Sequence, residues 1–145
     1  MHSKELVKLA REGMQHAYVP YSGFKVGAAV LASSGKVYTG CNVENASYGL
    51  TVCAERVAIF QAISAGEKNL EAIAVISSGK ERITPCGACR QVMAEFNPNL
   101  QLILADGQGE YQEYTLQELL PEMFSLDKED GKHADKKEKI VKKNL

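Results

Sequence analysis

The sequence predicts a three-layer α/β/α domain in which helices cover both faces of a mixed five-stranded sheet. Five short runs of apolar and β-branched residues are typical of strands. Stretches with helical periodicity separate them, in the order helix-strand-strand-helix-strand-helix-strand-strand-helix. The length of 145 residues, with 45% hydrophobic and 24% charged residues, suits one domain with a single core. We expect right-handed crossovers between the later strands.

The first third of the chain is expected to form a helix followed by a hairpin. Apolar residues at helical spacing mark the helix over residues 4–18, with Ser3 as its candidate N-cap and Pro20 just beyond its end. Two strand-like runs follow, at residues 26–31 and 36–41. The Ser-Ser-Gly sequence between them predicts a tight connection.

The middle of the chain combines a loop, a helix and a buried strand. Residues 40–51 are polar and loop-like, and helical periodicity returns over residues 53–65. Gly66 is a typical residue to end that helix. Residues 70–76 form a continuous apolar run, which predicts a strand covered on both faces.

The last elements are shorter. Pro85 is expected to open a helix over residues 86–96, because proline is favoured at a helix start. Residues 100–105 are expected to form a strand and residues 111–114 a short edge strand. A final helical turn is predicted at residues 116–120.

The charge distribution divides the chain into one domain, residues 1–126, and a tail, residues 127–145. The tail holds seven Lys and five Asp or Glu, a formal charge of +2, so the total of −1 leaves −3 on the body. We expect a flexible, solvated tail, with a basic helix that docks on a partner subunit or an anionic surface as the alternative. The acidic body argues against nucleic acid as a partner.

No apolar run approaches the roughly 18–20 residues of a membrane span, so no membrane partner is expected. The first residues lack the apolar stretch of a signal peptide, and the expected compartment is the cytoplasm. A reducing compartment argues against a disulfide framework for the four cysteines. The Cys-Gly-Ala-Cys sequence at residues 86–89 therefore indicates a metal or redox site.

Three cysteines at predicted helix starts favour an open zinc site. Cys53, Cys86 and Cys89 can supply three thiolates, and helix N-termini stabilise the deprotonated sulfur. A structural zinc site would need a fourth protein ligand. The candidates, none with clear ligand spacing, are Cys41, His2, His16 and His133. We expect a catalytic zinc with a fourth position for water.

Two charged residues follow Cys53 directly. The Glu55 carboxylate can reach the water on the metal and move its proton to a substrate nitrogen, whereas the simpler interpretation is a carboxylate favoured by the helix dipole. Three thiolates around Zn²⁺ leave a net charge of −1, which needs compensation. Arg56 is the candidate to donate hydrogen bonds to cysteine sulfur, with an ordinary surface cation as the alternative.

These segments together resemble the signature of the zinc-dependent cytidine deaminase superfamily. The signature is a ligand-x-Glu segment followed by Pro-Cys-x-x-Cys, here at residues 53–55 and 85–89. Further segments match the family in order, at residues 20–29, 40–48 and 119–124. Over about residues 4–124 the chain is similar to the small homotetrameric cytidine deaminases that act on free nucleosides.

The resemblance implies a cytidine deaminase-like fold and one Zn²⁺ per chain, held by Cys53, Cys86 and Cys89. It implies that Glu55 is the proton shuttle. Residues implied at the substrate are Phe24 against the pyrimidine, Asn42 and Glu44 at the ribose hydroxyls, the backbone of Ala54 at the base edge, and the carbonyl of Thr84 at the departing ammonia. Residues implied in a neighbouring subunit's pocket are Ala46, Tyr48 and Phe124. Structural alternatives remain: a core position for Phe24, an Asx-turn for Asn42 and a surface charge for Glu44.

The implied activity is the hydrolytic deamination of cytidine and 2′-deoxycytidine to uridine and 2′-deoxyuridine plus ammonia, in pyrimidine salvage. The implied assembly is a homotetramer with sites shared between subunits. Four alternatives stay open: a deaminase of a nucleoside antibiotic, a polynucleotide-editing deaminase, a structural zinc module with no use for Glu55, and a thioredoxin-like redox pair.

Overall fold

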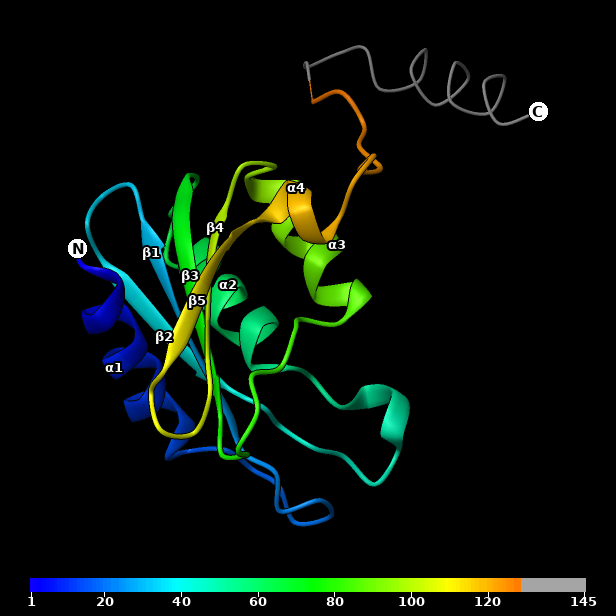
Figure 1. The fold of residues 1–145 in the computed structure, drawn as a ribbon. Coiled ribbons are helices and arrows are strands. Elements are labelled where there is room, and N and C mark those ends of the chain that lie inside the picture. Colours follow the sequence, from blue (N-terminus) through cyan, green and yellow to red (C-terminus); the bar gives the residue numbers. More distant parts are fainter. Residues whose placement is uncertain (129–145) are drawn as a thin grey trace.

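The computed structural model describes residues 1–128, and the predicted element order is confirmed (Figure 1). The helices are α1 (Ser3–Met14), α2 (Ala54–Ser64), α3 (Gly87–Phe96), α4 (Leu116–Leu119) and the short 3₁₀ helix η1 (Tyr48–Leu50). The strands are β1 (Val26–Ala32), β2 (Val37–Cys41), β3 (Leu70–Ser77), β4 (Gln101–Ala105) and β5 (Tyr111–Thr115). Except for residues 127 and 128, the predicted tail lies outside the described residues.

The five strands form one mixed sheet in the order β2-β1-β3-β4-β5. Only β3 and β4 pair in parallel, and α3 lies in the connection between them. β4 and β5 pair antiparallel, so the expectation of several crossovers is wrong for β5. The link between these two strands, residues 106–110, is far shorter than the dozen or so residues that a crossover needs.

Alternate residues of the sheet face two different helical layers (Figure 1). One face packs under α1, where Leu6 and Ala10 meet sheet residues such as Ile76. The opposite face packs under α2 and α3, where Ile59 and Met93 belong to the other buried cluster. β3 is buried along nearly its whole length, which confirms the prediction of a strand covered on both faces.

Two glycines let helices touch the sheet. A Cβ on Gly27 of β1 would lie 2.1 Å from the carbonyl oxygen of Ala10 in α1. A Cβ on Gly40 of β2 would lie 2.5 Å from the backbone nitrogen of Ala58 and 2.7 Å from the carbonyl oxygen of Ala54, both in α2. Any side chain at these positions would push a helix off its strand, so both contacts depend on glycine.

The first helix ends at Met14, four residues before its predicted end. Tyr18 instead forms an isolated parallel bridge with Val43. Its backbone N–H donates to the carbonyl oxygen of Asn42 at 3.0 Å, and its carbonyl oxygen accepts from the N–H of Glu44 at 2.9 Å. This long-range pairing requires an extended backbone and overrides the local helical pattern.

The start of α1 also differs from the prediction. The N-cap is His2, whose Nδ1 accepts a hydrogen bond from the backbone N–H of Lys4 at 3.2 Å. Ser3 is the first helical residue, and its hydroxyl donates to the carboxylate of Glu113 on β5. Within residues 1–128, no helix combines the length and apolar character needed to cross a bilayer.

Candidate active site

Three cysteines meet at the N-termini of two helices. Cys53 is the N-cap of α2, Cys86 is the N-cap of α3, and Cys89 lies in the first turn of α3. The helix begins at Gly87, one residue later than predicted, so Cys86 is its N-cap. Pro85, which is buried, lies directly before that N-cap. The peptide N–H groups that begin both helices therefore surround the three sulfur atoms, which favours thiolates.

The sulfur geometry fits a tetrahedral zinc ion. All three Sγ atoms lie within 4.8 Å of one another, with 3.9 Å between Cys53 and Cys86 and 3.5 Å between Cys86 and Cys89. Zinc–sulfur bonds of about 2.3 Å in a tetrahedron place sulfur atoms about 3.8 Å apart. The donor set is three thiols, the soft ligands that zinc takes readily.

The group contains no fourth ligand among residues 1–128. The candidates for that role that the structure describes, all outside the group, are His2, His16 and Cys41. His133 lies outside the described residues. Three protein ligands and one free position are the arrangement of catalytic zinc sites.

The thiols of Cys53 and Cys89 hold their protons unequally. A hydrogen bond from Cys89, together with those from Arg56 and Cys86, lowers the pKa of Cys53 to about 5. The pKa of Cys89 is raised because its thiol donates to Cys53 and because it is buried. Arg56 Nη2 lies 3.6 Å from Cys53 Sγ, so its positive charge lies beside the sulfur whose pKa is lowered.

Glu55 lies in the first turn of α2 and is only 3% exposed. Burial raises the pKa of its carboxyl group, and the negative charge of Cys53 raises it further. A carboxylate whose only role was to interact favourably with the helix dipole would have no need to be buried. A buried carboxyl with a raised pKa holds a proton more readily than an exposed one, which suits a group that must both gain and lose a proton.

Two of the cysteines, Cys53 and Cys86, line a pocket of about 210 Å³ together with Glu55. Its lining is Val26, Asn42, Thr51, Cys53, Ala54, Glu55, Ile83, Thr84 and Cys86. The structure thus brings together six of the residues that the sequence singled out. The prediction missed Val26, Thr51 and Ile83, which are ordinary apolar or hydroxyl residues. Only the position of Ile83, directly before Thr84, was a signal that could have found it.

Asn42 lies at the rim of this pocket and also fixes the start of β1. Its Oδ1 accepts from the N–H of Val26 at 2.9 Å, and its Nδ2 donates to the carbonyl oxygen of Phe24 at 2.9 Å. An amide side chain has two donor hydrogens and two acceptor lone pairs. One of each therefore remains for a ligand.

Glu44 lies in an adjoining pocket of about 350 Å³ that shares Thr51 with the first. Its carboxylate accepts hydrogen bonds from the backbone N–H groups of Tyr21 and Ser22 at 3.0 and 3.2 Å. It also accepts from the Ser22 hydroxyl at 2.5 Å, and this bond is the main cause that lowers the pKa of Glu44. These hydrogen bonds hold the negatively charged carboxylate of Glu44 in place at the pocket of about 350 Å³.

The remaining candidates lie outside the pocket of about 210 Å³ that Cys53 and Cys86 line, called the thiol pocket below. Phe24 is 39% exposed rather than a core residue, and its ring lies over Gly79. Tyr48 is 80% exposed and Phe124 is 57% exposed, and Ala46 is exposed as well. This chain alone does not bring these side chains to its own cysteines.

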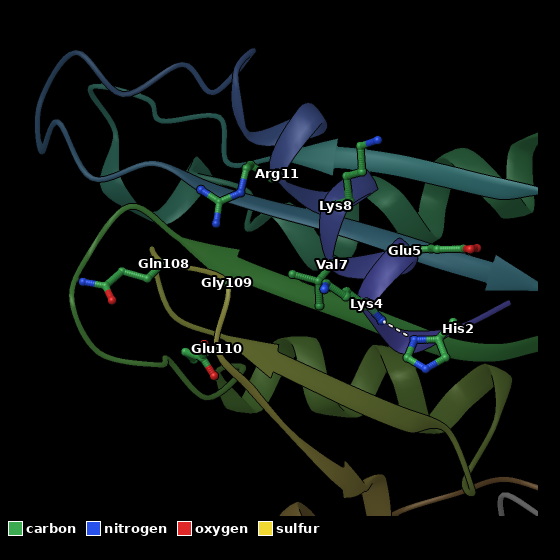
Figure 2. Close-up of a pocket in the computed structure, with 9 residues that line it drawn as sticks. All are labelled: His2, Lys4, Glu5, Val7, Lys8, Arg11, Gln108, Gly109 and Glu110. Carbon is green, nitrogen blue, oxygen red and sulfur yellow. Dashed lines mark hydrogen bonds between the residues drawn. The ribbon is translucent and has the colours of Figure 1, made fainter.

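A larger pocket, of about 550 Å³, lies on the other side of the sheet between α1 and the turn that joins β4 and β5 (Figure 2). Charged residues dominate its lining, which contains no cysteine. Of the residues singled out from the sequence, it contains only His2, a candidate fourth ligand that lies outside the cysteine group. Figure 2 shows Arg11 extending toward this turn, where its Nη1 donates to the carbonyl oxygen of Gly107 at 3.1 Å. Pocket volume therefore does not identify the site, whereas the thiol and carboxyl groups do.

Known proteins match this chain over most of its length. The family described as the cytidine and deoxycytidylate deaminase zinc-binding region matches residues 1–104. A cytidine deaminase of Halalkalibacterium halodurans is 51% identical over 128 residues, which cover 88% of this chain and 97% of that protein. A cytidine deaminase of Sporosarcina psychrophila is 45% identical over 135 residues, covering 92% and 98%.

Solved structures agree. The crystal structure of cytidine deaminase from Burkholderia pseudomallei superimposes with a TM-score of 0.82 at 48% identity, covering 86% of this chain and all of that one. Together with the zinc-binding region, the group formed by Cys53, Cys86 and Cys89 establishes one zinc ion per chain. The chain belongs to the cytidine and deoxycytidylate deaminase family of zinc hydrolases.

Proposed function

We propose that this protein hydrolyses cytidine and 2′-deoxycytidine to uridine and 2′-deoxyuridine with release of ammonia, and that it serves pyrimidine salvage. The observation that carries the proposal is the buried carboxyl of Glu55 in the same pocket as Cys53 and Cys86, two members of the three-cysteine group. The relatives named cytidine deaminases support this substrate class. The dependence on reduced thiols is consistent with a cytoplasmic location.

Glu55 is the proton carrier in this proposal. Zinc, when bound, acts as a Lewis acid and lowers the pKa of a water molecule. A Glu55 carboxylate oxygen takes a proton from the attacking water and passes it to N3 of the pyrimidine. It then takes a second proton from the hydroxyl newly bonded to C4, which becomes the carbonyl, and supplies that proton to the departing amine as the C4–N bond breaks. Water and cytidine thus become uridine and ammonia, and Glu55 ends in its starting state. Burial, which raises the pKa of Glu55, favours both halves of this exchange.

Nucleoside binding uses groups around the pocket. Asn42 offers its remaining donor and acceptor to one ribose hydroxyl, and Glu44 accepts from another. Phe24 offers an exposed ring on which a pyrimidine can stack. The backbone of Ala54 and the carbonyl of Thr84 border the thiol pocket, where the base edge and the leaving ammonia are expected.

A second copy of the chain completes the site in this proposal. The thiol pocket of about 210 Å³ is smaller than the roughly 300–1,000 Å³ of typical ligand pockets. Ala46, Tyr48 and Phe124 are exposed in the single chain, where Tyr48 and Phe124 present aromatic surface without a core to cover. We therefore propose a homotetramer in which these residues close a neighbour's pocket.

The experiment is loss of cytidine absorbance with purified protein and with the variant Glu55→Gln, with zinc counted in both. General acid–base catalysis contributes about 10²- to 10⁴-fold, so the variant is expected to be slower by that factor at unchanged zinc content. Glu71→Gln, an exposed carboxylate on β3, is the matched control and should keep the wild-type rate. A Glu55→Gln protein at the wild-type rate would exclude Glu55 as the proton carrier. A zinc-loaded wild type inactive on both nucleosides would overturn the proposed substrates.

A further inference from the structure

The C-terminal segment, residues 119–128, is tied to α3 by consecutive side chains of that helix. The guanidinium of Arg90 donates through Nη1 to the carbonyl oxygen of Leu119. Nε2 of Gln91 donates to the carbonyl oxygen of Phe124 at 3.0 Å. Backbone carbonyls at both ends of the Leu119–Phe124 stretch are thus held by adjacent residues of one helix.

A third contact continues the same path. Lys128 Nζ lies 3.0 Å from a carboxylate oxygen of Glu95, one turn further along α3. The two side chains are 63% and 54% exposed, and exposed ion pairs contribute little in water. The bonds from Arg90 and Gln91 are therefore the ones expected to position the segment.

The helix that provides these anchors also carries two of the metal ligands. Cys86 and Cys89 lie at its start, and Arg90 and Gln91 follow directly. The backbone N–H of Arg90 donates to the carbonyl oxygen of Cys86 at 3.0 Å, so the ligand and the anchor share one helical turn. The position of the segment relative to the zinc group is thereby set by a rigid element.

The segment bends sharply between its two anchors. Glu122 has a φ of 52°, in the left-handed region that non-glycine residues rarely occupy. Such a conformation persists when surrounding contacts hold it. Leu120 and Met123 pack against the core beside it, while Phe124 remains 57% exposed. The bend thus leaves an aromatic ring in solvent at a fixed place.

We infer that Arg90 and Gln91 are positioning residues that present Phe124 to the active site of a second copy of the chain. The inference rests on the proposed function, in which Phe124 closes a neighbouring pocket. It adds that one helix, α3, serves two sites: its first turn binds the metal of its own site, and the next two residues align the aromatic ring of the other.

The first test is the kinetics of Gln91→Met, which keeps the length of the side chain but removes its donor. One hydrogen bond contributes a net factor of about two to ten, so KM for cytidine should rise by that factor. The zinc content and kcat should stay near the wild-type values. Gln101→Met, at the exposed start of β4, is the matched control and should leave KM unchanged.

The decisive test is a mixed oligomer of Glu55→Gln chains and Gln91→Met chains. The Glu55→Gln chain lacks the proton carrier but presents Phe124 correctly. The Gln91→Met chain has the proton carrier but presents Phe124 incorrectly. In the mixed oligomer, some sites combine Glu55 of a Gln91→Met chain with Phe124 of a Glu55→Gln chain. These sites should turn over cytidine with the wild-type KM, which neither variant shows alone.

The outcomes separate the two ideas. A mixed oligomer that shows only the raised KM of Gln91→Met would place the effect within one chain and overturn the inference. An unchanged KM in Gln91→Met alone would also overturn it while leaving the proposed deamination intact. A wild type inactive on cytidine would overturn both. Arg90→Lys, which retains a donor, should have a smaller effect on KM than Arg90→Met.

Discussion

The two faces of the sheet differ in how their helices begin. α1 starts with a side-chain cap, because His2 accepts a hydrogen bond from the backbone of Lys4. α2 and α3 start at Cys53 and Cys86, and neither side chain makes a capping hydrogen bond. The N–H groups at these two starts remain free to stabilise negative charge on sulfur. A helix start left without a cap can thus mark a functional site.

The same contrast extends to what is buried. In the part of the chain that the structure describes, the layer under α1 buries apolar side chains only. The larger pocket beside it is lined mostly by charged residues. The layer under α2 and α3 contains the buried carboxyl of Glu55 and the buried thiol of Cys89. A buried titratable group is costly unless it is used, so it is a better guide to function than pocket size.

The largest expected difference between the faces concerns the metal. Cys89→Ser removes one of three thiolates, and activity should fall by more than about 100-fold, the upper end of what an outer-shell partner costs. Zinc per chain should fall with it, as measured by metal analysis. Cys41→Ser is the control, because Cys41 is a free thiol outside the ligand group. Equal zinc loss in both variants would contradict the assignment of the ligands.

Arg56→Ala should have the next largest effect. The guanidinium is 3.6 Å from Cys53 Sγ, and loss of such a partner typically costs about 10- to 100-fold in metal affinity or activity. We expect a folded protein with slower turnover and altered zinc retention, measured by circular dichroism, kinetics and competition with a chelator. Arg11→Ala on the α1 side, which loses a contact to a carbonyl oxygen, should leave both kinetics and zinc unchanged. Wild-type kinetics and zinc retention in Arg56→Ala would contradict this role.

The smallest effect should come from the two glycine contacts. Gly27→Ala and Gly40→Ala each force a methyl group against helix backbone, and each should lower the free energy of unfolding by about 1–3 kcal/mol. Only Gly40→Ala displaces α2, and so only it should also weaken zinc binding. Urea denaturation and metal analysis of the two variants together check this. Equal zinc retention in both would show that the position of α2 tolerates the shift.

Much of the architecture follows from local pattern. The strands at β1 and β3 are continuous apolar runs, and the hairpin is marked by the turn residues between β1 and β2. The three ligands and Glu55 could be recognised because their spacing is local to two helix starts. The end of α1 could not, because Tyr18 leaves the helix to pair with Val43, 25 residues away.

The site was less predictable than the fold. The pocket is also lined by Val26, Thr51 and Ile83, whose residue types occur throughout any core or loop and so do not distinguish them. Of the three, only Ile83 had a signal, which was its position directly before Thr84. The roles proposed for Tyr48 and Phe124 need a second chain, which the pattern of one sequence does not describe. The predicted domain boundary at residue 126 and the flexible tail remain predictions.

The two glycine contacts also constrain how the hairpin can pair. Gly27 lies opposite Cys41, and Gly40 lies opposite Ala28 in the adjacent pair. α1 and α2 therefore pack against the same stretch of the hairpin on opposite faces of the sheet. A slip of one residue in strand register would put a side chain where a glycine now allows contact. The docking of the two helices thus checks the alignment of the first two strands during folding, because a misaligned hairpin could not accept both helices at once.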